Sequence, residues 1–112
     1  MIKSILNAEH YVWGEKCEGW HLLKSASLSV IQEKMPAGTF ENKHYHNKSQ
    51  QLFFILNGIA TFEIGSKEYL VGENESVHIK PGIAHKIKNN SNKDLNFLVI
   101  SEPKSHGDRI NL

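Results

Sequence analysis

Several features that would place a chain in a special class are scarce or missing in this sequence. There is one cysteine, Cys17, so no disulfide can form within the chain, and we expect a reducing, cytoplasmic location. No apolar run approaches the ~20 residues that span a membrane. The first residues also lack the long apolar core of a secretory signal peptide. We therefore expect neither membrane insertion nor export.

An excess of charge of one sign is also missing. The 13 Lys and Arg residues against 12 Asp and Glu residues leave a net charge of +1, and the basic residues are spread along the chain. Proteins that bind nucleic acid usually concentrate positive charge on one face, so no nucleic-acid partner is expected. With 112 residues, of which 39% are hydrophobic, the chain can build one packed core. We expect residues 1–112 to form a single domain.

Helical periodicity is absent, and short segments of alternating apolar residues recur in its place. They are separated by turn sequences such as Asn57-Gly58, Gly65-Ser66 and Pro81-Gly82. The expected strands lie within residues 25–35, 43–46, 51–56, 59–64, 68–71, 76–80, 85–88 and 95–100. Regular short strands without helices between them predict an all-β sandwich or barrel.

The two ends of the chain are the least patterned. Residues 1–24 contain two short apolar segments around a turn-like centre, and their tryptophans are expected to pack on the core. The alternative places Trp20 or His21 at the rim of a pocket. From Ser101 onward a proline and a glycine predict irregular chain, whose last apolar residues dock on the body.

Three histidines occupy positions from which they can meet. His44 and His46 point to the same face of their strand, about 6.6 Å apart along it. Both can reach one metal ion if that strand lines a cavity. The following strand ends at Asn57-Gly58, which favours a tight hairpin turn. His85 follows the Pro81-Gly82 turn and opens another strand, so it lies at a strand end, where a barrel opens.

These residues match two motifs of a known family. Residues 38–58, GTFENKHYHNKSQQLFFILNG, resemble the first cupin motif, G-x5-H-x-H-x3,4-E-x6-G. Residues 74–89, with Gly82, His85 and Asn89, resemble the second motif, G-x5-P-x-G-x2-H-x3-N. The resemblance implies a double-stranded β-helix, or jelly-roll barrel, with a metal ion held inside by the motif histidines.

The chain departs from the family pattern at three positions. Lys80 takes the proline position of the second motif and Asn74 its first glycine position, and both changes are compatible with a turn. Gln51 stands where cupins most often have a glutamate ligand. The metal site is therefore expected to comprise His44, His46 and His85, with Gln51 either as a weak fourth ligand or as a donor to the bound molecule.

A neutral ligand set leaves a divalent ion close to its full charge and with open positions. Such a site favours a small, anionic, oxygen-rich molecule that chelates the ion. The sequence does not distinguish Fe, Mn, Ni, Zn and Cu. Phe53, Ile55, Ile79 and Ile87 are expected on the inward face around the metal, as a mostly apolar pocket. Glu33, from a neighbouring strand, is the candidate acid or base.

The face of the motif strand opposite the pocket is apolar as well. It carries Leu52, Phe54 and Leu56, and an apolar sheet face needs a cover. Small cupins commonly dimerise through their outer sheet, so the resemblance and this surface together predict a homodimer.

Three functions remain open at the level of sequence. The leading one is a metal-dependent cupin that performs dioxygenase-like or isomerase-like chemistry on a small oxygen-rich molecule. The second is a sensor or storage cupin that binds a small molecule without turnover, because no acid–base pair is evident in the motifs. The third is a metal-free sugar isomerase or epimerase in which a histidine acts as acid or base.

Overall fold

The computed structural model describes residues 1–112 and is built from strands joined by turns and loops. In chain order the strands are β1 (Glu9–Trp13), β2 (Cys17–Lys24), β3 (Ser29–Met35), β4 (His44–His46), β5 (Gln50–Asn57), β6 (Ala60–Ile64), β7 (Lys67–Val71), β8 (Ser76–Ile79), β9 (His85–Lys88), β10 (Leu95–Glu102) and β11 (Arg109–Asn111). The predicted all-β class is confirmed, and each strand expected between residues 25 and 100 is present. The structure contains no helix of the length and hydrophobicity that crossing a membrane requires.

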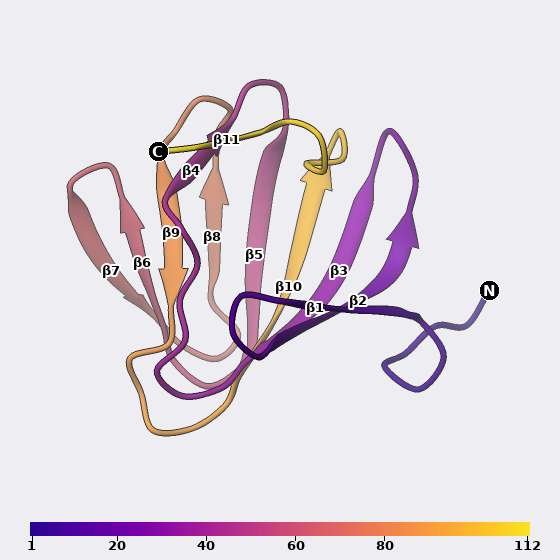
Figure 1. Ribbon diagram of the computed structural model, residues 1–112, viewed down its shortest axis with the longest axis horizontal. Helices are drawn as coiled ribbons and strands as arrows, with labels where there is room; N and C mark the ends of the chain where they lie inside the picture. The colour runs from indigo at the N-terminus through magenta and orange to yellow at the C-terminus, as the bar shows by residue number, and fades with distance from the viewer.

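The strands form two antiparallel sheets that enclose the core (Figure 1). The larger sheet has the order β1-β2-β3-β10-β5-β8, and the smaller has the order β11-β4-β9-β6-β7. Alternate residues of each strand face the other sheet, so Phe53, Phe62 and Phe97 meet in the interior. The rings of Phe53 and Phe62 lie 5.0 Å apart, edge to face. This packing is the double-stranded β-helix that the two motifs predicted.

The turn after β5 shows why the motif ends in glycine. Gly58 has a φ of 96°, in the left-handed region. A Cβ atom at this position would lie 2.8 Å from the backbone oxygen of Asp94, closer than real Cβ contacts. Glycine is therefore the residue that lets β5 turn back beneath the start of β10.

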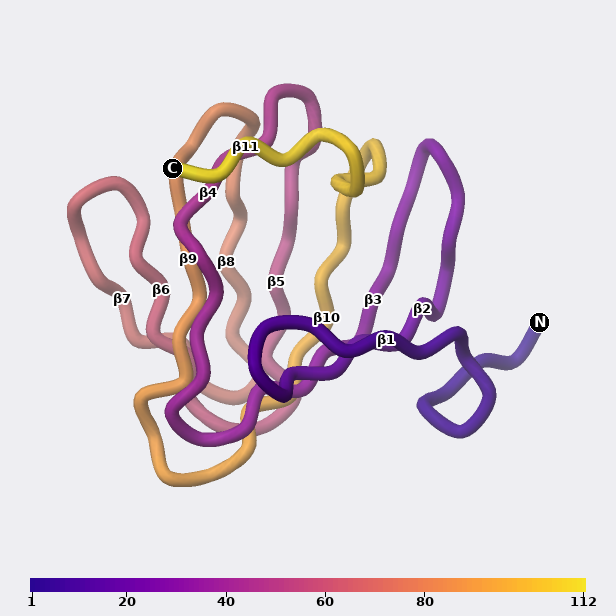
Figure 2. The backbone as a smooth tube through the Cα atoms, viewed as in Figure 1, coloured from indigo at the N-terminus to yellow at the C-terminus, as the bar shows by residue number.

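The end of the chain is more ordered than its composition indicates. β10 continues to Glu102, and β11 adds an edge strand to the smaller sheet by pairing with β4, with Arg109 opposite His46 and Asn111 opposite His44. The C-terminal segment consequently runs beside β4 at the open end of the barrel (Figure 2). The expectation of irregular chain was wrong for Arg109–Asn111, because strand pairing with β4 supplies the order that the sequence pattern lacks.

The contact between β4 and β9 is the narrowest in the smaller sheet. A single residue pair, His44 opposite His85, joins the two strands. The backbone N–H of Gly82, in the turn before β9, also donates to the carbonyl of His46 at 2.7 Å. The two histidine-bearing strands are thus held together at the histidines themselves.

At the other end, β1 and β2 form the hairpin that extends the larger sheet, while the residues before β1 project from the body (Figure 2). Trp20 is buried beside the His10 ring, at a centroid distance of 5.3 Å, so it packs as expected. His21 is buried as well. Tyr11 and Trp13, which lie on one face of β1, line a cavity in the barrel, and Cys17 of β2 is buried in the core.

Candidate metal centre and its cavity

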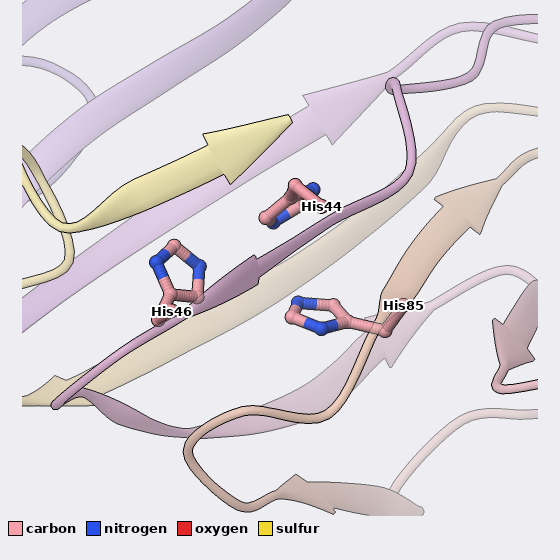
Figure 3. A group of neighbouring side chains, drawn as sticks. All are labelled: His44, His46 and His85. Atoms are coloured by element: carbon pink, nitrogen blue, oxygen red, sulfur yellow. The ribbon is translucent and has the colours of Figure 1, made fainter. Parts of the chain in front are cut away.

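The three motif histidines converge inside the barrel. His44 and His46 extend from β4 and His85 from the start of β9, and their rings face a common space (Figure 3). The ring centroids lie 4.4 to 5.7 Å apart, and one nitrogen from each ring lies within 4.8 Å of the others. We call these three residues the histidine cluster. All three are buried.

The backbone orients each ring of the histidine cluster in the same way. The Nδ1 atoms of His44, His46 and His85 face the carbonyl oxygens of Asn42, Asp108 and Ile83 at 2.8, 3.2 and 2.9 Å. A carbonyl only accepts, so each Nδ1 carries the proton and donates it. Each Nε2 is then left with a lone pair directed away from the backbone, which is the form in which imidazole binds a metal.

Gln51 completes the cluster from β5. Its amide nitrogen donates to Oγ of Ser101, the residue opposite it on β10, at 3.1 Å. This bond turns Oε1 of Gln51 toward Nε2 of His85, 3.2 Å away. Both atoms carry lone pairs, so they repel each other unless a cation lies between them. Two ligand atoms at right angles around an ion, each about 2.1 Å from it, are about 3.0 Å apart.

A second observation points to a cation in the same place. Nε2 of His46 is buried and has no hydrogen-bond partner in the protein, and a buried polar atom is normally partnered. The residues present therefore fit a divalent metal ion held by imidazole nitrogens and one amide oxygen, a ligand set suited to transition metals.

Burial keeps the histidine cluster neutral. Removal from water disfavours the imidazolium form and lowers the pKa of His44 to about 3 and that of His85 to about 4. The pKa of His46 is lowered for the same reason. All three rings are therefore unprotonated near neutral pH, which is the state that a metal requires.

His44 and His46 of the histidine cluster line a cavity of about 350 Å³, and His85 lies behind them, 3.2 Å from the lining residue Gln51. Of the inward residues predicted from sequence, Phe53 lines this cavity together with Gln51 and Glu33. Ile55, Ile79 and Ile87 lie in the buried core beneath it. Five of the fourteen lining residues are hydrophobic. The apolar side chains thus fill the closed end of the barrel, and polar ones surround its open end.

The same cavity is also lined by two carboxyl groups and a tyrosine. Glu33 extends from β3 and Glu41 from the segment before β4, and the Tyr11 hydroxyl donates to Oε2 of Glu33 at 3.0 Å. The backbone N–H of Ile87 donates to Oε1 of Glu41 at 3.1 Å. We call Glu33, Glu41 and Tyr11 the acid cluster. The sequence indicated Glu33 but not its partners, so an acid pair is present that the motifs alone do not reveal.

The acid cluster also tends toward neutrality. Burial raises the pKa of Glu33 to about 7, against the lowering effect of the Tyr11 hydrogen bond and of Arg109. Burial, together with the nearby Glu33, raises the pKa of Glu41 to about 8. These values lie near physiological pH, where a carboxyl group can both give and take a proton.

A glycine makes the bond between Tyr11 and Glu33 possible. Tyr11 pairs with Gly19 on β2, and Gly19 pairs in turn with Glu33 on β3, so the three residues form a row across the sheet. A Cβ atom at Gly19 would lie 2.3 Å from the Tyr11 ring. The tyrosine therefore crosses β2 through the space that the missing side chain leaves.

Arg109 is the cation of the cavity. It is the only arginine in the chain and the only Lys or Arg among the lining residues. Its Nε donates to Oδ1 of Asn111 at 2.8 Å and its Nη2 to the carbonyl of Asn42 at 3.2 Å. Nη1 lies 3.9 Å from Oε2 of Glu41. The sequence analysis did not identify Arg109 as a site residue because it lies outside both motifs. The one feature of the sequence that could have indicated it is that the chain contains no other arginine.

Comparison with protein families agrees with this site. A model described as a cupin domain matches residues 31–101, which include both motifs and the histidine cluster. The chain belongs to the cupin family.

Two curated relatives extend the likeness over most of the chain. An uncharacterised protein of Methanocaldococcus jannaschii is 28% identical over 89 residues, covering 79% of this chain and 71% of the relative. An oxalate-binding protein of Thermotoga maritima is 28% identical over 85 residues, covering 71% of this chain and 70% of the relative. Among solved structures, a predicted oxalate decarboxylase of Thermotoga maritima superposes with a TM-score of 0.82 and 22% identity, covering 93% of this chain and all of that one. This structural likeness establishes the fold.

Proposed function

We propose that this cupin is a metal-dependent protein that binds a small, oxygen-rich carboxylate and transfers protons on it. The observation that carries the proposal is that one cavity is lined both by neutral histidines, His44 and His46, and by two carboxyl groups of raised pKa, Glu33 and Glu41. The name of the oxalate-binding relative supports a carboxylate as the ligand.

His44, His46 and His85 would hold the ion through their Nε2 atoms, and Gln51 through Oε1. A bound divalent ion would supply an electrophilic centre for an oxygen atom of the ligand. Fe, Mn, Ni, Zn and Cu all accept such a donor set. Because all the donors are neutral, the charge of the ion stays available to an anionic ligand.

Glu33 and Glu41 would supply the acid and the base in this proposal. Tyr11 fixes one oxygen of Glu33, and the Ile87 N–H fixes one oxygen of Glu41, so each carboxyl presents its other oxygen to the cavity. Groups whose pKa lies near the working pH are the most effective general acids and bases. This arrangement favours enolisation or isomerisation over oxygen insertion, which needs no such pair.

The experiment that tests the proposal combines elemental analysis with calorimetry. Untagged protein is expected to contain a stoichiometric divalent transition metal and to bind oxalate, and chelator-treated protein is expected to lose oxalate binding while staying folded by circular dichroism. Native protein without stoichiometric metal, or oxalate binding that survives removal of the metal, would contradict it.

A second candidate is ligand binding without turnover, and the relative that is named for binding favours it. In that case the acid cluster would only recognise the ligand. Glu41→Gln separates the two candidates: an enzyme loses its product formation and keeps its ligand affinity, whereas a binding protein shows no product before or after the change.

We also propose a homodimer formed through the outer face of the larger sheet. Apolar side chains on adjacent strands form a continuous half-buried patch there, since Ile100 pairs with Leu52 on one side and with Val30 on the other, and Leu98 pairs with Phe54. A patch of this kind typically marks an interface. Sedimentation at the mass of one chain, 12.7 kDa, would count against it.

A further inference from the structure

The cavity extends well beyond the histidine cluster. Its volume of about 350 Å³ lies at the lower end of the range for small-molecule pockets, roughly 300–1,000 Å³. A ligand as small as oxalate would occupy only the end beside the histidines. The remainder is bounded by Glu33, Glu41 and Trp13, which we call the far subsite.

The carboxyl groups of the far subsite retain unused hydrogen-bonding capacity. In each, one oxygen accepts from the protein, from the Tyr11 hydroxyl for Glu33 and from the Ile87 N–H for Glu41. The second oxygen of each accepts no hydrogen bond, and that of Glu41 lies 3.9 Å from Arg109. Carboxyl oxygens with free lone pairs recognise hydroxyl groups as donors.

Trp13 adds a donor without an acceptor. Its ring lines the cavity, and Nε1 is buried with no hydrogen-bond partner in the protein. A buried indole N–H usually finds an acceptor, so a ligand oxygen is the natural partner here. Since Trp13 can donate and the two carboxyls can accept, the far subsite suits groups that do both, and a hydroxyl group is the simplest of these.

Arg109 lies beside residues of both parts of the cavity, because it pairs with His46 on β4 and its Nη1 is 3.9 Å from Oε2 of Glu41. Its positive charge disfavours protonation of the histidine cluster. The same charge favours ionisation of Glu33 and Glu41 in the acid cluster. Two of its nitrogens are held by Asn42 and Asn111, while Nη1 makes no hydrogen bond. A guanidinium group fixed in this way is suited to a carboxylate.

We propose that the ligand is a hydroxylated carboxylic acid of several carbons, with its carboxylate between the histidine cluster and Arg109 and its hydroxyl groups on Glu33, Glu41 and Trp13. This inference rests on the proposed function, which it deepens by naming the ligand class. It requires hydroxyl groups that donate to Glu33 and Glu41. Oxalate cannot make these two contacts, because it has no hydroxyl group.

The test uses metal-loaded protein and calorimetry with four probes: oxalate, and the hydroxy acids glycerate, threonate and gluconate. Affinity is expected to rise along the hydroxy-acid series, as more hydroxyl groups reach the far subsite. Glu33→Leu removes both acceptor oxygens and should weaken the best hydroxy acid about tenfold or more. Oxalate, which has no hydroxyl group for Glu33, should be weakened less than the hydroxy acid. Trp13→Phe, which keeps the ring and removes the N–H, should weaken the same probe by about threefold to tenfold.

Glu63→Leu is the matched control, because Glu63 pairs with Lys43 outside the cavity and should leave all four affinities unchanged. Binding of oxalate without binding of any hydroxy acid would overturn this inference and leave the proposed function in place. The inference also fails if Glu33→Leu and Trp13→Phe weaken oxalate and the hydroxy acids equally. If neither kind of probe binds and no metal is present, both proposals fail.

Discussion

The histidine cluster and the acid cluster respond to burial in opposite ways. In the histidine cluster burial lowers the pKa of three bases, and in the acid cluster it raises the pKa of two acids. Burial thus favours the neutral form in both clusters. A neutral imidazole offers a lone pair, whereas a neutral carboxyl group offers a proton. Burial therefore keeps the histidine cluster in the form that binds a cation and the acid cluster in the form that exchanges protons.

The histidine cluster and the acid cluster also differ in which parts of the chain position them. The backbone orients the histidine cluster through three carbonyl oxygens close to β4 and β9. Side chains from distant segments position the acid cluster: Tyr11 from β1, and Arg109 from β11, which lies near Glu41. We therefore expect the histidine cluster to depend mainly on its backbone contacts, the one from Asp108 included, and the acid cluster to depend on side chains from distant segments.

The largest loss of metal affinity should come from removing one member of the histidine cluster. His44→Ala is expected to weaken metal binding at least about a hundredfold, because loss of an outer partner of a ligand already costs about tenfold to a hundredfold. Metal-competition titration measures this. His78→Ala is the matched control, since His78 is exposed and bonds only to Gln50. Equal losses in the two variants would show that position 44 is not a ligand.

The next effect tests the support that Asp108, the residue before β11, gives to the histidine cluster. The Asp108 carboxylate accepts from the backbone N–H groups of Asn47, Lys48 and Ser49 at 2.9 to 3.2 Å, and its carbonyl accepts from His46. Asp108→Ala should release this segment and weaken metal binding about tenfold. Unchanged affinity in the same titration would mean that β4 alone positions His46.

Metal affinity should rise when the neutral ligand Gln51 is replaced by an anionic one. Gln51→Glu places a carboxylate beside Nε2 of His85 and should strengthen metal binding by about tenfold, since a charged oxygen is a better ligand for a divalent ion. Gln50→Glu adds the same charge at the exposed neighbouring residue and should change little. If both variants bind the ion alike, general electrostatics accounts for the gain and Oε1 of Gln51 does not reach the ion.

The smallest effect concerns the stability of the metal-free protein. The folded pKa of Glu33 and Glu41, about 7 and 8, exceeds the ordinary value of 4.5, so the folded state binds more protons and loses stability as pH rises through this range. The histidine cluster acts oppositely, but only below its ordinary pKa of 6.5. Between pH 6.5 and 8 the melting temperature should therefore fall by several degrees.

The double variant Glu33→Gln, Glu41→Gln should remove this fall, as measured by thermal unfolding in the presence of a chelator. Glu63→Gln serves as control, because lysine neighbours lower the pKa of Glu63 and it stays ionised throughout the range. A decline of the same size in the double variant would place its origin outside the acid cluster.

The sequence predicted the barrel and the histidine cluster because both depend on local rules. Alternation, turn residues and motif spacing act over a few positions, and from them we predicted that His44 and His46 share a face of one strand and that His85 opens another. Tyr11, Glu41 and Arg109 depend on pairing between distant segments. Nothing near Tyr11 shows that it lies over Gly19, and the three residues of β11 are exposed and carry no pattern of their own.

The single residue pair between β4 and β9 has a mechanical consequence. Residues 38–41 continue the backbone pairing with residues 87–89, so a local separation of β4 from β9 should be least costly at the histidine cluster. An ion bound to residues on both strands would act as a cross-link across this seam. Amide hydrogen exchange of the segment from Gly82 to Lys88 should then slow on metal loading far more than that of β10, whose pairing on both sides already protects it.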